Sequence, residues 1–235
     1  MIANRRGVIC LLIYGLLAVG LCGCDEKLPA LNPFHKPPAE EHGITTPTQR
    51  ITDLRQLAKD APQNSDPAKR EAICSELVQQ IRKEPDANMR MEILRTLAAY
   101  GGPTADEVLK AAVKDTDADV RALVCDLWAK RNDAAAAQIL IGALGNDSDR
   151  DVRMAAARGL GHIHDPAVAR ALATALDDTD PAMRHMAMVA LHESTGKDFG
   201  SNPGDKEAIA SWKKYLTTGE ETPPTWSQRV FPWLR

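Results

Sequence analysis

Apolar residues recur at helical spacing along most of the chain, from about Ile51 to Leu216. Leu, Ile, Val and Ala return every three or four residues, and positions with that spacing lie on one face of an α-helix. Short breaks separate the runs, as at Gly101-Gly102-Pro103 and Asp165-Pro166, where glycine and proline interrupt a helix. The pattern therefore predicts a series of amphipathic helices joined by short turns.

Five of the helical segments open with the same short motif, an Asp followed by three residues and an Arg. In the last four copies the Arg residues are 31, 32 and 31 positions apart, which indicates a repeated helix–turn–helix unit. The first copy lies only 20 residues before the second, and we interpret it as an atypical capping helix. The copies are Asp66–Arg70, Asp86–Arg90, Asp117–Arg121, Asp149–Arg153 and Asp180–Arg184.

The two ends of the motif have different expected roles. Asp is a good helix N-cap because its carboxylate accepts a hydrogen bond from a free backbone N–H of the first turn. Pro67 and Pro181 then fall at the first helical position, where a missing N–H costs nothing. Arg lies one turn further along, where it can pair with its own Asp or with a neighbouring one. We expect the ten side chains to form a structural polar ladder, with a row of ligand-binding groups as the alternative.

A second helix is predicted before each of the later motifs, at 103–115, 133–144 and 166–176. These segments are rich in Ala, Leu and Ile and are amphipathic. Because neither helix of a pair can bury its apolar stripe alone, the helical hairpins must stack to build a continuous core.

Residues 149–166 show the repeat in full: an Asp-rich turn, Val-Arg, an Ala-rich helix, Leu-Gly, and Asp-Pro opening the next helix. Over residues 66–192 this pattern resembles short HEAT-like repeats of the phycobilisome-lyase type. The resemblance implies an all-α fold, a right-handed α-α superhelix of about four to five helical-hairpin repeats. Residues 194–200 are similar to the Thr-Gly-x-x-Phe-Gly…Trp ending of some bacterial HEAT-repeat proteins. We therefore expect Phe199 and Trp212 to cap the apolar end of the stack.

The N-terminus has the pattern of a targeting segment. Arg5 and Arg6 precede an uncharged run that ends Leu21-Cys22-Gly23-Cys24, which resembles a bacterial lipobox. The resemblance implies cleavage between Gly23 and Cys24 and lipid attachment to Cys24. The chain would then be held on a membrane of the bacterial cell envelope, inner or outer, facing the periplasm or the exterior. An uncleaved transmembrane helix is the alternative, since about 18 uncharged residues reach the lower limit for a span.

Two proline-containing segments flank the repeats. Residues 24–50 contain five prolines and no apolar periodicity, as expected of a linker that holds a domain away from the membrane. The tail, 217–235, contains three prolines together with two Trp and one Phe. We expect a signal peptide at 1–23, this linker, a repeat domain at 51–216 and the tail.

Charge and composition restrict the class of partner. Without residues 1–23, which contain two basic residues, 27 basic and 32 acidic residues remain, a net charge of −5. A mildly acidic chain with no basic block is a poor candidate for nucleic-acid binding. The aromatic share of 4% suits thin, closely packed helices rather than a β-sandwich. We expect a protein or peptide partner.

Candidate catalytic and metal-binding residues are few. Cys74 and Cys125 occupy a repeat position that elsewhere holds Leu94, Ala157 and Met188, so we interpret them as core thiols rather than nucleophiles.

Histidine and methionine residues offer a possible metal site. His162 and His164 fall in a turn between repeats, while His185, His192 and several Met residues share one helix. Solvated imidazoles and core-filling methionines are the simpler interpretation than a metal or copper(I) site. The His-Glu pairs that hold two irons in deoxyhypusine hydroxylase, a HEAT-like enzyme, have one counterpart here, His192-Glu193. We expect no catalytic residue, metal or cofactor.

Positions one and five after each motif Arg point away from the apolar stripe. They form a row of small, weakly charged side chains, which we expect to bind a peptide or protein segment, with Met91 and Met154 as adaptable contacts. Burial of the row between repeats is the alternative. The row consists of Met91, Arg95, Ala122, Asp126, Met154, Arg158, His185 and Val189.

These observations predict a membrane-anchored, non-catalytic binding or scaffolding module. Two alternatives remain: a lipoprotein that binds a small ligand or metal, and an enzyme related to the bilin lyases, which share the repeat.

Overall fold

The computed structural model describes residues 46–202 and 204–219, which form ten α-helices, one short 3-10 helix and no strand. The all-α fold predicted from the sequence is thus confirmed. The helices are α1 (Pro47–Asp60), η1 (Ala61–Gln63), α2 (Pro67–Ile81), α3 (Ala87–Tyr100), α4 (Pro103–Ala112), α5 (Ala118–Ala129), α6 (Ala134–Asn146), α7 (Arg150–Leu160), α8 (Pro166–Ala175), α9 (Pro181–Thr195) and α10 (Lys206–Thr218).

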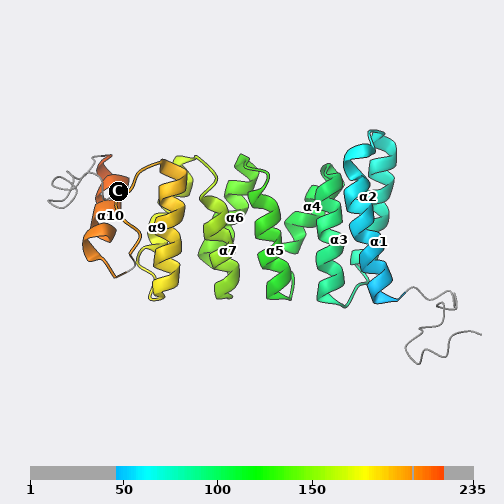
Figure 1. Ribbon diagram of the computed structural model, residues 1–235, viewed down its shortest axis with the longest axis horizontal. Coiled ribbons are helices and arrows are strands. Elements are labelled where there is room, and N and C mark those ends of the chain that lie inside the picture. Colours follow the sequence, from blue (N-terminus) through cyan, green and yellow to red (C-terminus); the bar gives the residue numbers. More distant parts are fainter. Residues whose placement is uncertain (1–45, 203, 220–235) are drawn as a thin grey trace, which may run out of the picture. The chain divides into compact units, whose positions relative to one another are not determined.

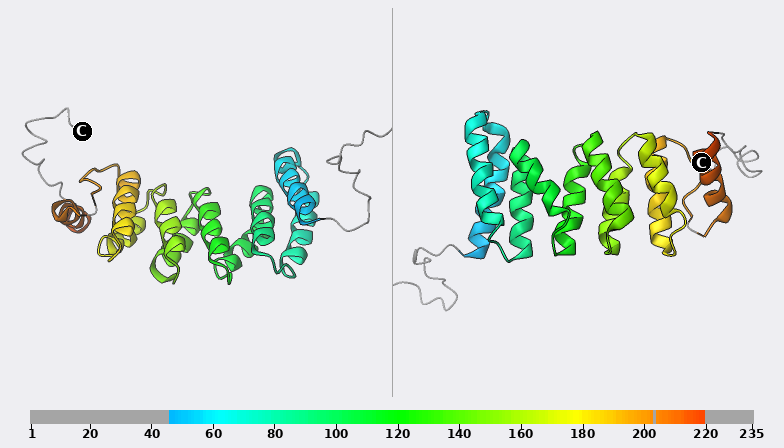
Figure 2. Two further views of the ribbon diagram at one scale, coloured as in Figure 1. Left: turned by 60° about the horizontal axis from the view of Figure 1, so that its bottom comes forward. Right: turned by 180° about the vertical axis from the view of Figure 1, so that it is seen from behind.

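The helices alternate between two rows (Figure 1). In the odd-numbered row α1 packs on α3, α3 on α5, α5 on α7 and α7 on α9. In the even-numbered row α2 packs on α4, α6 on α8 and α8 on α10. Figure 1 shows α4 and α6 behind the odd-numbered row, and Figure 2 shows the same helices from two further directions. Each helical hairpin therefore stacks on the next, which makes this region an α-α solenoid.

The five motifs do not occupy equivalent places in the two rows. The last four begin α3, α5, α7 and α9 in the odd-numbered row, whereas the first begins α2 in the even-numbered row. The short interval between the first two copies has this cause: α2 and α3 are consecutive helices of different rows. The first helix of the odd-numbered row, α1, has no motif and is capped by Thr46 instead.

The motif Asp residues cap their helices as predicted. In each copy the carboxylate accepts a hydrogen bond from a backbone N–H two or three residues further on. Asp133, Asp165 and Asp205 do the same at α6, α8 and α10. Each cap satisfies a donor that the first helical turn would otherwise leave without a partner.

The core lies between the two rows. Trp128, Leu160 and Leu172 are completely buried there. At Gly159 the helices approach so closely that an added Cβ would lie 2.8 Å from Ala129 Cβ and 3.2 Å from Leu140 Cδ1. This contact requires a residue without a side chain.

The end of the stack is covered as the sequence predicts. Phe199 packs edge-on against Trp212, with ring centroids 4.9 Å apart, and lies 5.4 Å from the ring of Tyr215. Trp212 is fully buried, and its indole Nε1 donates a hydrogen bond to the Gly200 carbonyl at 3.1 Å. The segment between α9 and α10 is thereby fixed over the core.

The first helix begins before the expected domain boundary. The sequence pattern places residues up to 50 in the linker, yet α1 starts at Pro47, because Thr46 caps it and proline fits the first helical position. The signal segment, Cys24, most of the linker and the tail from residue 220 lie outside the described residues. Within the described part of the chain, no helix combines the length and apolar character needed to cross a lipid bilayer.

Candidate protein-binding face

A polar ladder joins the odd-numbered helices at their N-terminal ends. Arg90 Nε and Nη2 donate to the two carboxylate oxygens of Asp115 at 2.9 and 2.7 Å. One repeat later, Arg121 donates in the same way to Asp147 at 2.8 and 3.0 Å. All four side chains are at most 14% exposed, so these two-point pairs are largely protected from water.

The expectation that motif Asp and motif Arg residues pair with each other is wrong for Arg90 and Arg121. Asp117 and Asp149 are used as helix caps, and the guanidinium groups instead bind Asp115 and Asp147, each two residues earlier. Asp115 and Asp147 also accept the backbone N–H of the motif Asp that follows, both at 2.9 Å. Of the motif carboxylates, Asp180 does form an ion pair, with Arg150 rather than with a motif Arg.

Each later motif Arg also binds the turn that precedes its own helix. Arg121 Nη1 donates to the Asp115 carbonyl at 2.8 Å, and Arg153 Nη1 donates to the Asp147 carbonyl at 3.0 Å. Arg184 makes the matching contact, 2.8 Å, to the carbonyl of Asp178. Arg153 has no ion pair with any carboxylate of the described residues, so the ladder lacks this connection between α7 and α9.

The first motif Arg has other partners, as its position in the even-numbered row requires. Arg70 Nη1 donates to the carbonyls of Ala61 and Asn64 at 2.7 and 3.0 Å. Its Nη2 contacts the Tyr100 carbonyl, and the guanidinium lies 5.3 Å from the centre of the Tyr100 ring. Arg70 therefore ties α2 to the end of α3.

Ion pairing lowers the pKa of both ladder carboxylates. For Asp147 the hydrogen bond from Arg121 is the main cause, and it outweighs the effect of burial. Burial acts to raise the pKa of Asp115, but the hydrogen bonds from Arg90 and the Asp117 N–H together lower it. The same ion pairs raise the pKa of both arginines. The four side chains are therefore charged at neutral pH, and their ion pairs join neighbouring repeats.

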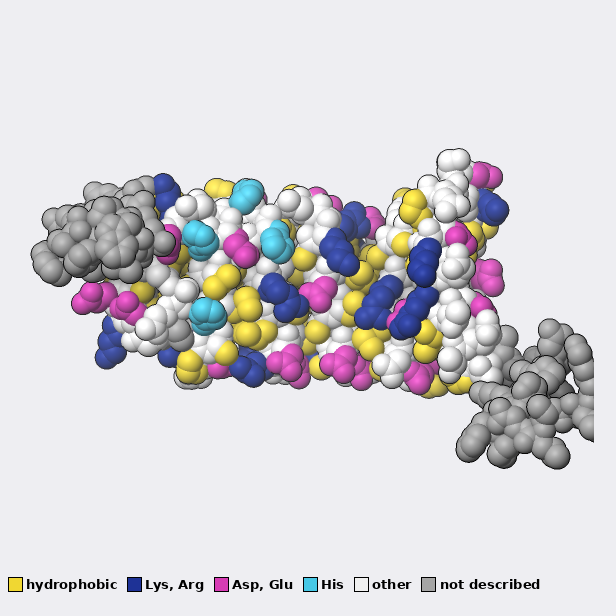
Figure 3. All heavy atoms as spheres, in the orientation of Figure 1, with side chains coloured by type: hydrophobic (Ala, Val, Ile, Leu, Met, Phe, Trp, Pro, Cys, Tyr) yellow, Lys and Arg dark blue, Asp and Glu magenta, His cyan; other side chains and the backbone are white. Residues whose placement is uncertain are grey.

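The predicted partner row lies on the odd-numbered helices, the side of the molecule seen in Figure 3. None of its eight residues is buried. Arg95, Arg158 and His185 are exposed, and the others are half-buried. The alternative, in which packing between repeats buries the row, does not hold for these residues.

Two ion-pair clusters lie on this face. Arg158 Nη2 pairs with Asp126 Oδ1 at 2.7 Å, and both side chains are about half exposed. Closer to α1, Arg55 Nη2 and Arg95 Nη1 both donate to one oxygen, Glu92 Oε1, each at 2.8 Å. The Glu92 side chain is only 8% exposed, whereas those of Arg55 and Arg95 are 63% and 44% exposed.

Arg55 and Glu92 are not among the site residues predicted from the sequence. A signal was nevertheless present in the alignment of the repeats, two positions after the motif Arg. There α5, α7 and α9 have Leu123, Ala155 and Met186, so the charged residue in α3 departs from the pattern.

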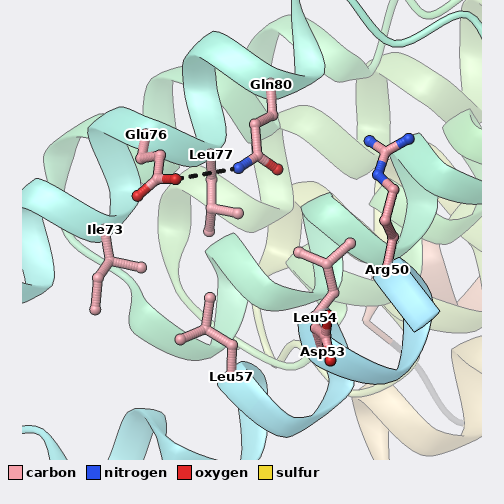
Figure 4. Close-up of a pocket in the computed structure, with 8 residues that line it drawn as sticks. All are labelled: Arg50, Asp53, Leu54, Leu57, Ile73, Glu76, Leu77 and Gln80. Carbon is pink, nitrogen blue, oxygen red and sulfur yellow. Dashed lines mark hydrogen bonds between the residues drawn. The ribbon is translucent and has the colours of Figure 1, made fainter. Parts of the chain in front are cut away.

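An apolar groove of about 480 Å³ opens between α1 and α2 (Figure 4). Leu54 and Leu57 of α1 face Ile73 and Leu77 of α2 across it. Polar side chains line its edges, among them Glu76, which accepts a hydrogen bond from Gln80 at 3.4 Å. The groove lies in the first hairpin, which carries none of the residues of the partner row.

Three histidines contact the backbone near the end of the stack. In each, ring Nδ1 lies within hydrogen-bond distance of a backbone carbonyl, which for His164 belongs to the last turn of α9 and for His185 and His192 to the segment after α9. The described residues contain no group of three or more His, Cys, Asp or Glu arranged to hold a metal ion. The pairs are His164 with Ser194 at 2.8 Å, His192 with Lys197 at 2.8 Å, and His185 with Ser201 at 2.6 Å.

The two cysteines of the repeat region are core residues, as predicted. Cys74 and Cys125 are free thiols with 1% and 0% exposure. Burial raises the pKa of both, and that of Cys125 to about 12. The thiolate form needed for nucleophilic chemistry is therefore strongly disfavoured.

A family model for HEAT repeats matches the chain at residues 74–158 and again at 140–222, together more than half of its length. The chain belongs to the HEAT-repeat family. The two matches of this HEAT-repeat protein begin within α2 and extend past α10, so they include the ladder and all eight residues of the partner row. A comparison with curated proteins gives no match.

Proposed function

We propose that this HEAT-repeat protein is a membrane-anchored, non-catalytic module that binds a protein segment on its odd-numbered face. The observation that carries the proposal is the accessible row across α3, α5, α7 and α9, in which short or flexible side chains predominate. Stacked repeats use such extended faces to bind proteins. Met91 and Met154 are half-buried and unbranched, so they can adapt to the shape of a bound segment.

A non-catalytic role is supported by the partners of the titratable groups. In the described region, the acids and bases with clearly shifted pKa values are ion-paired residues or helix caps, and the shifted thiols are in the core. Active sites concentrate perturbed groups in a cleft. Here the perturbed groups are distributed along the ladder, at helix ends and in the Arg55–Glu92 cluster, and they do not converge on one cleft.

The membrane anchor in this proposal is a lipid on Cys24, with residues 1–23 removed. The support is the lipobox-like sequence Leu21-Cys22-Gly23-Cys24 after an uncharged run. The 22 residues from 25 to 46 would then connect the anchor to α1, and a fully extended chain of that length spans about 75 Å. The face could thus bind a partner at some distance from the membrane surface.

The anchor is tested by replacing Cys24 with Ala in the full chain. We expect the variant to lose fatty-acid labelling and to retain its signal segment, because both lipid attachment and cleavage depend on the thiol. Labelling of the variant at the wild-type level would refute the anchor, and the binding face would then need another explanation for its location.

The binding face is tested by purifying the tagged full chain from membranes. Met91→Asp combined with Met154→Asp should leave the helical circular-dichroism spectrum unchanged and remove the co-purifying partner, because carboxylates replace the two flexible apolar contacts of the row. Lys110→Asp, on the exposed side of α4, is the matched control and should retain the partner. If the double variant keeps its partner, the segment binds elsewhere.

A further inference from the structure

Arg55 and Arg95, here called the arginine pair, form a distinct site within the odd-numbered face. We propose that the arginine pair binds a carboxylate of an acidic segment in the partner protein. This inference rests on the proposed function and specifies the chemistry of the partner. It is carried by the geometry around Glu92.

The arginine pair has hydrogen-bond donors to spare. A guanidinium group carries five N–H donors. Arg55 and Arg95 each donate one hydrogen bond to Glu92 Oε1, and no other residue of the described region accepts from either of them. Most donors of both groups therefore face solvent, where a second carboxylate can accept two parallel hydrogen bonds from one guanidinium.

Glu92 holds the two guanidinium groups together before any ligand arrives. Its side chain is almost completely buried, so its position is fixed by the packing of α3. Thr96 Oγ1 lies 2.8 Å from the Glu92 carbonyl and 3.2 Å from the Leu54 carbonyl, which fixes α1 against α3 at the same level. Preorganisation of this kind reduces the entropy lost when a ligand binds.

The cluster has an excess of one positive charge, because two arginines share one carboxylate. The other cluster on the face, Arg158 with Asp126, is neutral. Figure 3 shows dark blue Lys and Arg side chains gathered over α3 and toward α1. The chain as a whole is acidic, but charges more than about 8 Å away are largely screened at physiological salt. The local excess therefore decides what binds here.

The size of this charge and its surroundings favour a protein segment. Lipid-binding basic clusters contain about four to eight Lys or Arg residues, and nucleic-acid sites neutralise several phosphates. Here one excess charge lies one helical turn along α3 from Met91, a half-buried side chain that packs against the apolar core. The occupant thus combines a carboxylate with apolar side chains, as an acidic and apolar peptide does.

A buried Glu is costly at a position where the other repeats have apolar residues. Leu123, Ala155 and Met186 occupy the equivalent positions of α5, α7 and α9. Because apolar residues at such sites commonly give equal or greater stability, the charged cluster is not required for stacking. Departures from a repeat pattern of this kind are typical of functional positions.

The test is selection of a displayed library of random 12-residue peptides on the full chain in detergent micelles. We expect wild-type protein to enrich peptides with Asp or Glu next to apolar residues. Arg95→Gln should abolish the acidic preference and weaken binding of a selected acidic peptide about tenfold, as should replacing that peptide's Glu by Gln. Arg170→Gln, at an exposed position of α8 in the even-numbered row, is the matched control and should change this affinity less than about twofold, because Arg170 is not part of the odd-numbered face.

Arg95→Gln is suitable because Arg95 is exposed and Glu92 retains Arg55; an unchanged melting temperature checks that the variant folds. Selection of peptides without acidic preference, lost in the Met91→Asp, Met154→Asp variant, would overturn this inference and leave the proposed function standing. Failure to select any peptide would overturn both. Displacement of the acidic peptide by phosphatidylglycerol vesicles would assign the arginine pair to lipid and likewise overturn the inference.

Discussion

At the scale of single residues, the motif Asp and the motif Arg act in different directions. Asp caps the helix that it begins, whereas Arg90 and Arg121 each reach a carboxylate before the next odd-numbered helix. The caps could be predicted from sequence because capping depends on residues at most three apart. The partners of Arg90 and Arg121 could not, because they lie 25 and 26 residues away and become neighbours only when the repeats stack.

Arg121 and Arg153 allow the contribution of the ion pair to be separated from that of the carbonyl contacts. Both donate to the preceding turn, but only Arg121 also binds a carboxylate. Arg121→Ala should lower the free energy of unfolding by about 2–3 kcal/mol, because Asp147 is left partly buried and unpaired. Arg153→Ala should cost about 1 kcal/mol. Urea unfolding checks both values, and equal losses would show that the ion pair adds nothing.

The lowered pKa of Asp147 predicts a pH dependence of stability. A carboxyl whose pKa is depressed on folding stabilises the protein above its unfolded pKa of about 3.9, and this contribution is lost as the pH falls through the folded value. Asp147→Asn should therefore be less stable than wild type at pH 6, and the difference should shrink as the pH falls from about 4 to 3. A difference that stays constant over this range would contradict the assigned ion pair.

At the scale of helices, the repeat pattern predicted the number and order of elements better than their ends. The helix predicted at 133–144 extends to Asn146, and that predicted at 103–115 ends at Ala112. Pro47 was placed in the linker because proline usually interrupts helices, yet at the first helical position it is tolerated. The assignment of α2 to the even-numbered row depends on long-range packing, which the motif alone does not encode.

Close packing of helices makes a specific prediction at Gly159. An added Cβ there would meet Ala129 Cβ at 2.8 Å, so Gly159→Ala should lower the free energy of unfolding by about 1–3 kcal/mol through overpacking.

Gly142, within α6, is the matched control for this substitution. A Cβ at Gly142 meets no atom within 4 Å, so Gly142→Ala should stabilise the protein by about 0.5–1 kcal/mol through its helix propensity. Chemical denaturation of both variants measures the two effects. Stabilisation by Gly159→Ala would show that α7 can move away from its neighbours at little cost.

At the scale of the molecule, stacking turns a local period of about 31 residues into a continuous face. The sequence alone located that face, because helical periodicity separates the exposed positions from the apolar stripe. It did not locate the arginine pair, because Arg55 comes from a helix without the motif and meets Glu92 37 residues later in the chain. The alignment of the repeats marks Glu92 as a departure, but its pairing with an arginine of α1 is visible only in the three-dimensional arrangement.

Site-specific photocrosslinking in cells tests the central claim, that the odd-numbered face binds a protein partner, most directly. A photoreactive benzoylphenylalanine is placed at Arg158 or Val189 on that face, and at Lys110 of α4 or Gln138 of α6 on the even-numbered row. We predict that irradiation produces an adduct of one discrete mass from the first two positions and none from the second two. Adducts formed equally from both rows, or only from the even-numbered row, would contradict the proposed binding face.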